Sequence, residues 1–118
     1  MNKRLHHLAR IAFSRVIFIE EKGICYTCGG RATGVGHLFH GVLDFFRLNN
    51  HLQCTPCNCG KGGQIKIYRE KVIRLNGQQK FDEMRTKAMG EKAKGREYSD
   101  DYLKGVCKEY TGILEEIQ

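Results

Sequence analysis

Four cysteines of this 118-residue chain form two C-x2-C pairs. The first pair is Cys25 with Cys28, and the second is Cys54 with Cys57. Each C-x2-C turn aims two thiolates at one point, and two such turns complete the tetrahedral ligand set that Zn²⁺ prefers. Four protein ligands leave no position open for a substrate, so we expect a structural zinc ion that the fold of so small a chain requires.

Other uses of the cysteines stay open at this point. The two pairs could form disulfides, or one pair could be a redox-active C-x-x-C motif. Cys59 lies close enough to Cys57 in the chain to compete for the fourth zinc position. Cys107 lies on the apolar face of a predicted C-terminal helix, where we expect a buried core residue. Residues 1–20 do not resemble a signal peptide, and no apolar run is long enough to span a bilayer, so we expect a cytoplasmic protein with metal-bound thiolates.

A histidine, two asparagines and a lysine are spaced around the second cysteine pair. They are His37, Asn49, Asn58 and Lys61. Asn49 stands five residues before the third cysteine of the zinc set, and Asn58 directly follows the fourth. Imidazole accepts a proton near neutral pH, and a divalent cation offsets the charge on a phosphate and on its leaving 3′ oxygen. The spacing resembles the HNH, or His-Me finger, nuclease motif.

The HNH resemblance implies a role for each of these residues. It implies that His37 is the general base of phosphodiester hydrolysis and that Asn49 orients the His37 ring through a hydrogen bond. It implies further that Asn58 binds Mg²⁺ or Mn²⁺ and that Lys61 contacts phosphate. Structural interpretations stay open beside these roles, since a histidine beside a zinc turn can be a packing group and a loop asparagine can cap a turn.

One position departs from the HNH pattern. The family usually places an aspartate or histidine just before the base, as a second cation ligand, whereas this chain has Gly36. A carboxamide is a neutral ligand, so Asn58 alone would bind the cation weakly. We predict His40 as the further cofactor-binding residue, with Asp44 and His51 as alternatives that the sequence leaves open.

A closer resemblance covers most of residues 12–117. The segments that show it are Ala12–Ser14, Cys25–Gly29, Asn49–Asn58 with the pattern N-x-H-x-Q-C-x-x-C-N, and Ser99–Lys104. They resemble the phage lambda NinG (Rap) family, in which the residue before the base is often not acidic. This family often has a histidine where Gly60 stands, and a proline in the loop after the base that this chain lacks. The resemblance implies a structure-specific endonuclease that acts on Holliday junctions and D-loops in the cytoplasm of a host bacterium.

The charge of the chain agrees with a nucleic-acid partner. The net charge is +7 and the isoelectric point is about 9.2, which favours an anionic partner. A junction-binding protein neutralises phosphates with little readout of base sequence. The predicted nucleic-acid-binding residues are Arg31, Lys61, Lys66, Arg69 and Arg74, with Lys71, Lys80, Arg85 and Lys87 as further candidates. Symmetric cleavage of a four-way junction requires two active sites, so a homodimer is a reasonable hypothesis.

The elements that must position these residues form one predicted domain, residues 1–118. Its parts are an N-terminal helix at 3–21, a zinc-containing core at 24–76 and C-terminal helices at 78–118. We predict an α+β fold that is mostly helical, with a zinc-stapled treble-clef or ββα-metal core packed among three or four helices.

Finer expectations concern the irregular segments. We expect a β-hairpin with an irregular tip at 31–39, because glycines interrupt it, and a short strand near 45–48. A solvated linker at 91–97 precedes the last helix, for which Ser99 is the predicted cap. The residues of the first helix expected in solvent include His6, His7 and Arg10.

Two functions other than a nuclease stay open. A zinc-stabilised module could bind DNA junctions without cutting them, and Gly36 with the weak ligand set is the best support for it. A zinc-ribbon-like module could instead bind proteins. Binding to DNA weakens steeply as salt rises where phosphate contacts dominate, whereas a protein adaptor would show little affinity for DNA.

Overall fold

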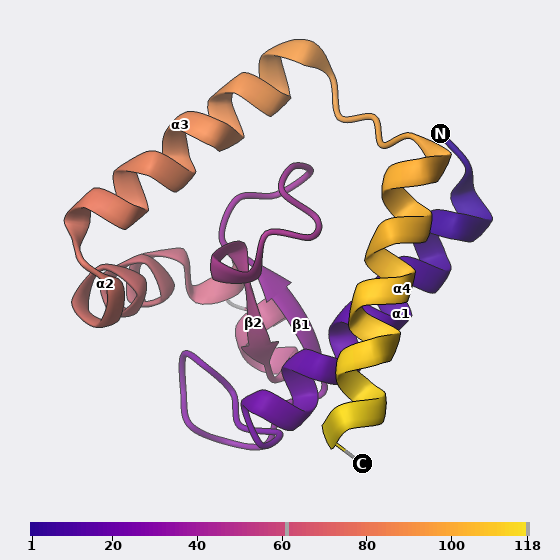
Figure 1. Ribbon diagram of the computed structural model, residues 1–118. Helices are drawn as coiled ribbons and strands as arrows, with labels where there is room; N and C mark the ends of the chain where they lie inside the picture. The colour runs from indigo at the N-terminus through magenta and orange to yellow at the C-terminus, as the bar shows by residue number, and fades with distance from the viewer. Residues whose placement is uncertain (61, 118) are drawn as a thin grey trace.

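The computed structural model of the protein describes residues 1–60 and 62–117. It is mostly helical, with a small sheet between the helices (Figure 1). The α-helices within the described residues are α1 (Lys3–Glu20), α2 (Ile65–Asn76), α3 (Gln78–Lys94) and α4 (Asp100–Ile117). This arrangement confirms the predicted α+β, mostly helical fold class. Among the described helices, none is both long and apolar enough to cross a membrane.

Helices α1 and α4 lie side by side and run in the same direction (Figure 1). Their facing surfaces bury Phe13 and Ile17 of α1 against Leu103 and Val106 of α4. The ring of Phe13 also meets the ring of Tyr110 edge to face, with the ring centroids 4.9 Å apart. Burial of one large apolar side chain contributes about 1.5–3 kcal/mol, so this helix pair is a main source of stability.

The ends of these two helices follow the signals in the sequence. Helix α1 stops where Lys22 and Gly23 take φ angles of 55° and 69°, a left-handed conformation that glycine adopts without a steric penalty. At the start of α4, the Ser99 hydroxyl accepts a hydrogen bond from the Tyr102 N–H at 3.1 Å. The predicted cap of the last helix is therefore confirmed.

The sheet consists of β1 (Gly34–His37) and β2 (Asn50–Gln53), which pair antiparallel. His37, at the end of β1, lies opposite Asn50, at the start of β2. The strands therefore place the predicted base next to a residue that is thirteen positions away in the chain.

Two predictions about the sheet are wrong, the hairpin at 31–39 and the strand near 45–48, although β1 lies within the first of them. Residues 31–39 do not form a hairpin of their own, because β1 pairs with β2. Residues 47–49, at the end of the strand predicted near 45–48, form a single 3₁₀ turn instead. All four residues of β2 are buried, so β2 lacks the alternation of polar and apolar residues that reveals a half-exposed strand.

A second core cluster lies between the helices α2 and α3 and the loop that follows β1. Leu38 and Leu43 of the loop pack with Tyr68 of α2 and with Met84 of α3. Helix α3 passes over this loop before the chain crosses to α4 (Figure 1). The loop after His37 is therefore held from above by a helix as well as by its own strands.

Helix α3 is longer than predicted. It continues to Lys94, although the sequence predicts a solvated linker at 91–97. The Glu91 carboxylate accepts hydrogen bonds from the Leu43 N–H at 2.9 Å and from the Tyr98 hydroxyl at 2.7 Å. The last turn of α3 is therefore fixed by partners that are distant in the sequence, which a local pattern does not reveal.

Candidate functional site

The two C-x2-C pairs meet at one end of the sheet. The sulfur atoms of Cys25, Cys28, Cys54 and Cys57 all lie within 4.8 Å of one another, and those of Cys28 and Cys54 are 3.6 Å apart. Cys59 is exposed and does not belong to this group. The cluster could hold a zinc ion with Cys57 as the fourth ligand. Among the described cysteines, none is paired in a disulfide.

The ionisation of the thiols shows why a cation fits this cluster. Burial disfavours the Cys25 thiolate, but the Thr27 hydroxyl and nearby backbone N–H groups favour it more strongly and lower the pKa of Cys25 to about 6. The Gly30 N–H favours the Cys28 thiolate, but the neighbouring cysteines outweigh it and raise the pKa of Cys28 to about 12. Cys25 therefore loses its proton readily, whereas Cys28 does not. A bound Zn²⁺ would supply the positive charge that allows all four thiols to ionise.

His37 lies at the other end of the sheet, and its ring orientation is fixed by Asn50. The Nδ1 atom of His37 is 2.6 Å from Oδ1 of Asn50. The Asn50 amide nitrogen donates to the Leu43 and Phe46 carbonyls at 3.1 and 2.7 Å, so its oxygen must face His37. His37 therefore carries a hydrogen on Nδ1 and a lone pair on Nε2, which is the atom free to accept a proton.

Asn49 does not orient the ring, and this part of the prediction is wrong. Its side chain is fully buried and faces the loop after β1. The Asn49 oxygen accepts the Phe39 N–H at 2.7 Å, and its nitrogen donates to the Phe39 and Val42 carbonyls at 3.1 and 3.3 Å. Asn49 thus fixes the shape of the loop. The sequence contains two adjacent asparagines, and only the register of β2 decides which one faces His37.

The surroundings of His37 keep its ring uncharged. Burial lowers the pKa of His37 below its usual value, and the positive charge of Arg10 lowers it further, while the hydrogen bond to Asn50 acts in the opposite direction. Arg10 donates to Asn50 Oδ1 at 3.3 Å and to the backbone carbonyl of Asp44. Arg10 is therefore half-buried beside the site, and the expectation that it lies in solvent is wrong. At neutral pH a neutral imidazole of this kind can take a proton from water.

Asp44 is engaged elsewhere and is not free to hold a cation. Its buried carboxylate lies 2.7 Å from Nε2 of His6 and 3.1 Å from Arg96, and its backbone N–H donates to the Tyr98 hydroxyl at 3.1 Å. His6 is consequently bound to Asp44 and is not part of a solvated pair, whereas His7 is exposed as predicted. These contacts tie α1 and the segment between α3 and α4 to the loop after His37.

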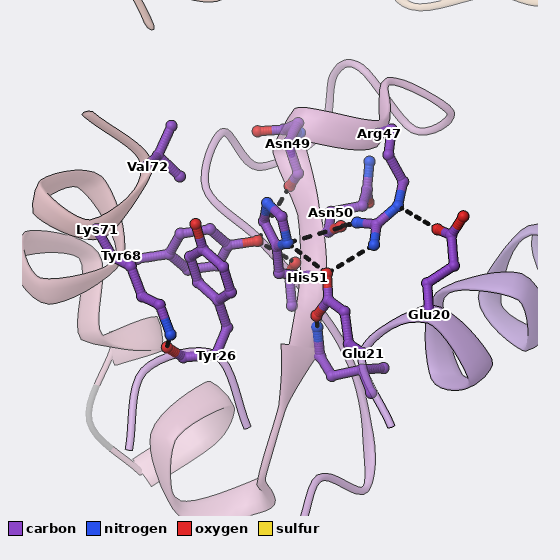
Figure 2. Close-up of polar contacts among 12 residues, drawn as sticks. Glu20, Glu21, Tyr26, Arg47, Asn49, Asn50, His51, Tyr68, Lys71 and Val72 are labelled. Atoms are coloured by element: carbon purple, nitrogen blue, oxygen red, sulfur yellow. Dashed lines mark hydrogen bonds and ion pairs between the residues drawn. The ribbon is translucent and has the colours of Figure 1, made fainter. Parts of the chain in front are cut away.

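His51 is likewise committed to a structural network (Figure 2). Its Nδ1 donates to the Glu21 carboxylate at 2.5 Å, and its ring stacks on Tyr26 with centroids 3.9 Å apart. Glu21 also accepts from Arg47 at 2.7 Å and from the Leu52 N–H at 2.8 Å. Burial raises the pKa of Glu21, but these donors, His51 first, outweigh it and lower the pKa. The sequence does not predict this role of Glu21, because its partners are 26 or more positions away in the chain.

His40 is the candidate ligand that the structure brings near the base. Its ring is perpendicular to that of His37, with centroids 6.2 Å apart, and it is exposed on the loop. Asn58 lies in a helical turn at Pro56–Gly60, where its backbone N–H donates to the Cys54 carbonyl at 2.9 Å. The Asn58 side chain makes no hydrogen bond with the described residues. It is half-buried and available as a ligand.

Comparison with known proteins gives one family. The family model described as Bacteriophage Lambda NinG protein matches residues 8–118. The chain belongs to the NinG family. The match spans both cysteine pairs and every predicted site residue. No curated protein and no solved structure matches this NinG-family chain.

The NinG-family chain keeps most of its predicted phosphate contacts at the surface. The exposed ones are Arg31, Lys66, Arg69, Arg74, Lys80, Arg85 and Lys87. Lys61 lies outside the described residues. Lys71 is the exception, because its ammonium donates to the Tyr26 carbonyl at 2.9 Å and lies 4.4 Å from the centroid of the Tyr26 ring. Lys71 therefore secures the first cysteine turn instead of facing solvent.

Proposed function

We propose that this NinG-family protein is a divalent-metal-dependent, HNH-type endonuclease that cuts branched DNA such as Holliday junctions and D-loops. The observation on which this rests is the geometry of His37: Asn50 Oδ1 holds Nδ1–H, which leaves the lone pair of Nε2 free, and burial lowers the pKa of the ring. Such a ring can remove a proton from the water that attacks the phosphorus atom of a phosphodiester. His37 takes up this proton and becomes an imidazolium ion, the conjugate acid of the base.

Two metal ions have separate places in this proposal. Zn²⁺ in the four-cysteine cluster is structural, because four thiolates leave no open position. Mg²⁺ or Mn²⁺, when bound by Asn58 and His40, supplies the positive charge that stabilises the phosphate and the leaving 3′ oxygen. The carboxamide oxygen of Asn58 fits a hard cation, since Mg²⁺ and Mn²⁺ take oxygen ligands, and the exposed His40 imidazole would add a nitrogen ligand.

The substrate class follows from charge. The chain carries a net charge of +7, and its exposed arginines and lysines can pair with phosphates without reading bases. A homodimer would supply the second active site for symmetric cleavage of a four-way junction. Sedimentation with and without junction DNA tests this point, and a monomer in both samples contradicts it.

The experiment for the function compares a labelled four-way junction with its linear duplex arms in Mg²⁺ and in Mn²⁺. The variants are wild type, His37→Ala and the control His7→Ala, which removes an exposed histidine. We expect cleavage of the junction alone, lost in His37→Ala and kept in His7→Ala, with junction binding and zinc content unchanged. Equal cleavage by His37→Ala contradicts the proposal.

A second candidate is a junction-binding module that does not cut. It is favoured by Gly36, where the HNH pattern has a cation ligand. Tight junction binding by wild type, with no cleavage in any divalent metal, would establish this alternative.

A further inference from the structure

Gln53, the last residue of β2, has a carboxamide with one unpartnered atom. The side chain is only 1% exposed. Its nitrogen donates to the Gly63 carbonyl at 2.9 Å and to the Thr27 hydroxyl at 3.1 Å. Since a carbonyl can only accept, the nitrogen must face Gly63, and this fixes the direction of the oxygen. Oε1 of Gln53 is buried and has no hydrogen-bond partner among the described residues, which is uncommon in a folded protein.

The Gln53 oxygen points into the place where a side chain of residue 36 would begin. A Cβ atom built on Gly36 would lie 1.8 Å from Gln53 Oε1 and 2.7 Å from its Cδ. Gly34 lies opposite Gln53 and Gly36 opposite His51, so the Gln53 side chain leans diagonally across the face that both glycines leave open. The position that the HNH pattern gives to a cation ligand is thus filled by an oxygen from the neighbouring strand.

His40, on the loop, lies near the residue that holds the Gln53 amide. A Cβ atom built on Gly63, the residue whose carbonyl holds Gln53, would lie 3.8 Å from Nε2 of His40. The His40 ring in turn lies beside that of His37. The side chains of Gln53 and His40 therefore both lie close to Gly63.

We propose that Oε1 of Gln53 is a ligand of the divalent cation, in place of the acidic side chain that Gly36 lacks. This inference rests on the proposed function for the role of that cation. A carboxamide oxygen is a hard ligand of the kind that Mg²⁺ and Mn²⁺ accept, and it is neutral. The cation would keep its full charge and most of its coordination positions for a phosphate. Binding to the protein alone is then weak, and it strengthens when DNA is present.

The first test measures Mn²⁺ binding to the zinc-loaded protein from the electron paramagnetic resonance signal of free Mn²⁺. Gln53→Met removes the oxygen and keeps the length of the side chain. We expect its Mn²⁺ affinity to fall about ten- to a hundredfold, the size of effect seen when metal-site partners are removed. The control Gln79→Met makes the same change at an exposed glutamine of α3, far from the zinc ligands in the chain, and it should bind Mn²⁺ as wild type does. Zinc content is measured for every variant.

The second test restores the ligand from the other strand, so that a folding defect is not mistaken for a lost ligand. Gln53→Ala clears the space at residue 36, and Gly36→Asp in the Gln53→Ala background places a carboxylate there. The double variant should bind Mn²⁺ at least as tightly as wild type, whereas Gln53→Ala alone should bind it weakly. Wild-type affinity in Gln53→Met, or a double variant no better than Gln53→Ala, overturns the assignment and makes Oε1 an acceptor for a buried water.

The failure of this inference and that of the proposed function give different results. If wild type does not cut junctions but its Mn²⁺ binding depends on Gln53, the cation site stands and the nuclease is rejected. If wild type cuts and the Mn²⁺ dependence of cleavage is the same in Gln53→Met, the nuclease stands and Gln53 is not a ligand.

Discussion

The two ends of the short sheet hold groups that are fixed in different ways. At one end, four thiols converge because two turns of the chain each supply a pair. At the other end, His37 depends on Asn50, Arg10 and a loop held by Asn49, which are brought together from separate parts of the chain. Each cysteine pair is therefore specified locally by its own turn, and we expect the cysteine end to need a cation to fold. The histidine end is specified by tertiary contacts between separate segments of the chain.

The largest effect is expected at the cysteine end. Cys57→Ser should abolish zinc binding and most of the folded state, since structural zinc contributes about 10–16 kcal/mol of apparent binding energy in small zinc domains. Cys59→Ser is the matched control, because Cys59 is exposed and outside the cluster. Zinc content and thermal unfolding distinguish them. Retention of zinc by Cys57→Ser together with its loss in Cys59→Ser would reverse the assignment of the fourth ligand.

The next largest effect is expected from the ion pairs that anchor the histidine end. Asp44→Asn leaves His6 and Arg96 without their buried carboxylate and should lower the free energy of unfolding by about 3–5 kcal/mol. Asp82→Asn breaks a solvent-exposed pair with Arg85 and should lower it by at most about 1 kcal/mol. Urea unfolding measures both. Equal effects would show that the Asp44 network does not hold the loop.

A smaller effect is expected from substitutions of Asn49 and Asn50, and it differs between the two residues. Asn49→Ala should destabilise the protein by about 1–3 kcal/mol, because buried loop carbonyls lose their donor, while the tautomer of His37 stays fixed. Asn50→Ala should instead let His37 exchange between tautomers. Nitrogen-15 shifts of the His37 ring report this directly. A mixed tautomer in Asn49→Ala with a fixed one in Asn50→Ala would show that Asn49, and not Asn50, orients the ring.

The sequence predicts the features that depend on neighbouring residues and misses those that depend on residues distant in the chain. Each C-x2-C pair, the end of α1 and the Ser99 cap are set within a few residues of chain, and the sequence predicts all three. The two cysteine pairs meet across 26 positions, but each pair is visible in the sequence. It does not reveal Asn50, because the register of β2 decides which asparagine faces His37, and every residue of β2 is buried. Nor does the sequence reveal the position of the Gln53 side chain, because its partner across the sheet, Gly34, has no side chain that would indicate a contact. The catalytic roles stay predictions.

The smallest expected effect is on stability as a function of pH. The pKa of His37 is lowered in the folded protein by burial and then by Arg10, so the unfolded chain takes up the proton first as pH falls. Stability should therefore decrease as pH drops below about 6.5, the usual value for histidine, and level off below the folded pKa. His37→Gln should show a shallower decrease than wild type in urea titrations. A steeper decrease in the variant would show that the folded protein favours the charged ring.

The most direct test of the central claim is the pH dependence of junction cleavage under single-turnover conditions. A neutral His37 that acts as the base predicts that the rate is maintained as pH falls through about 6.5 and declines only below it. In His37→Ala the residual rate should lose this acid limb. An acid limb that is unchanged in His37→Ala would show that His37 is not the base, and one at or above about 6.5 that is lost in His37→Ala would show that the pKa of the base is not lowered.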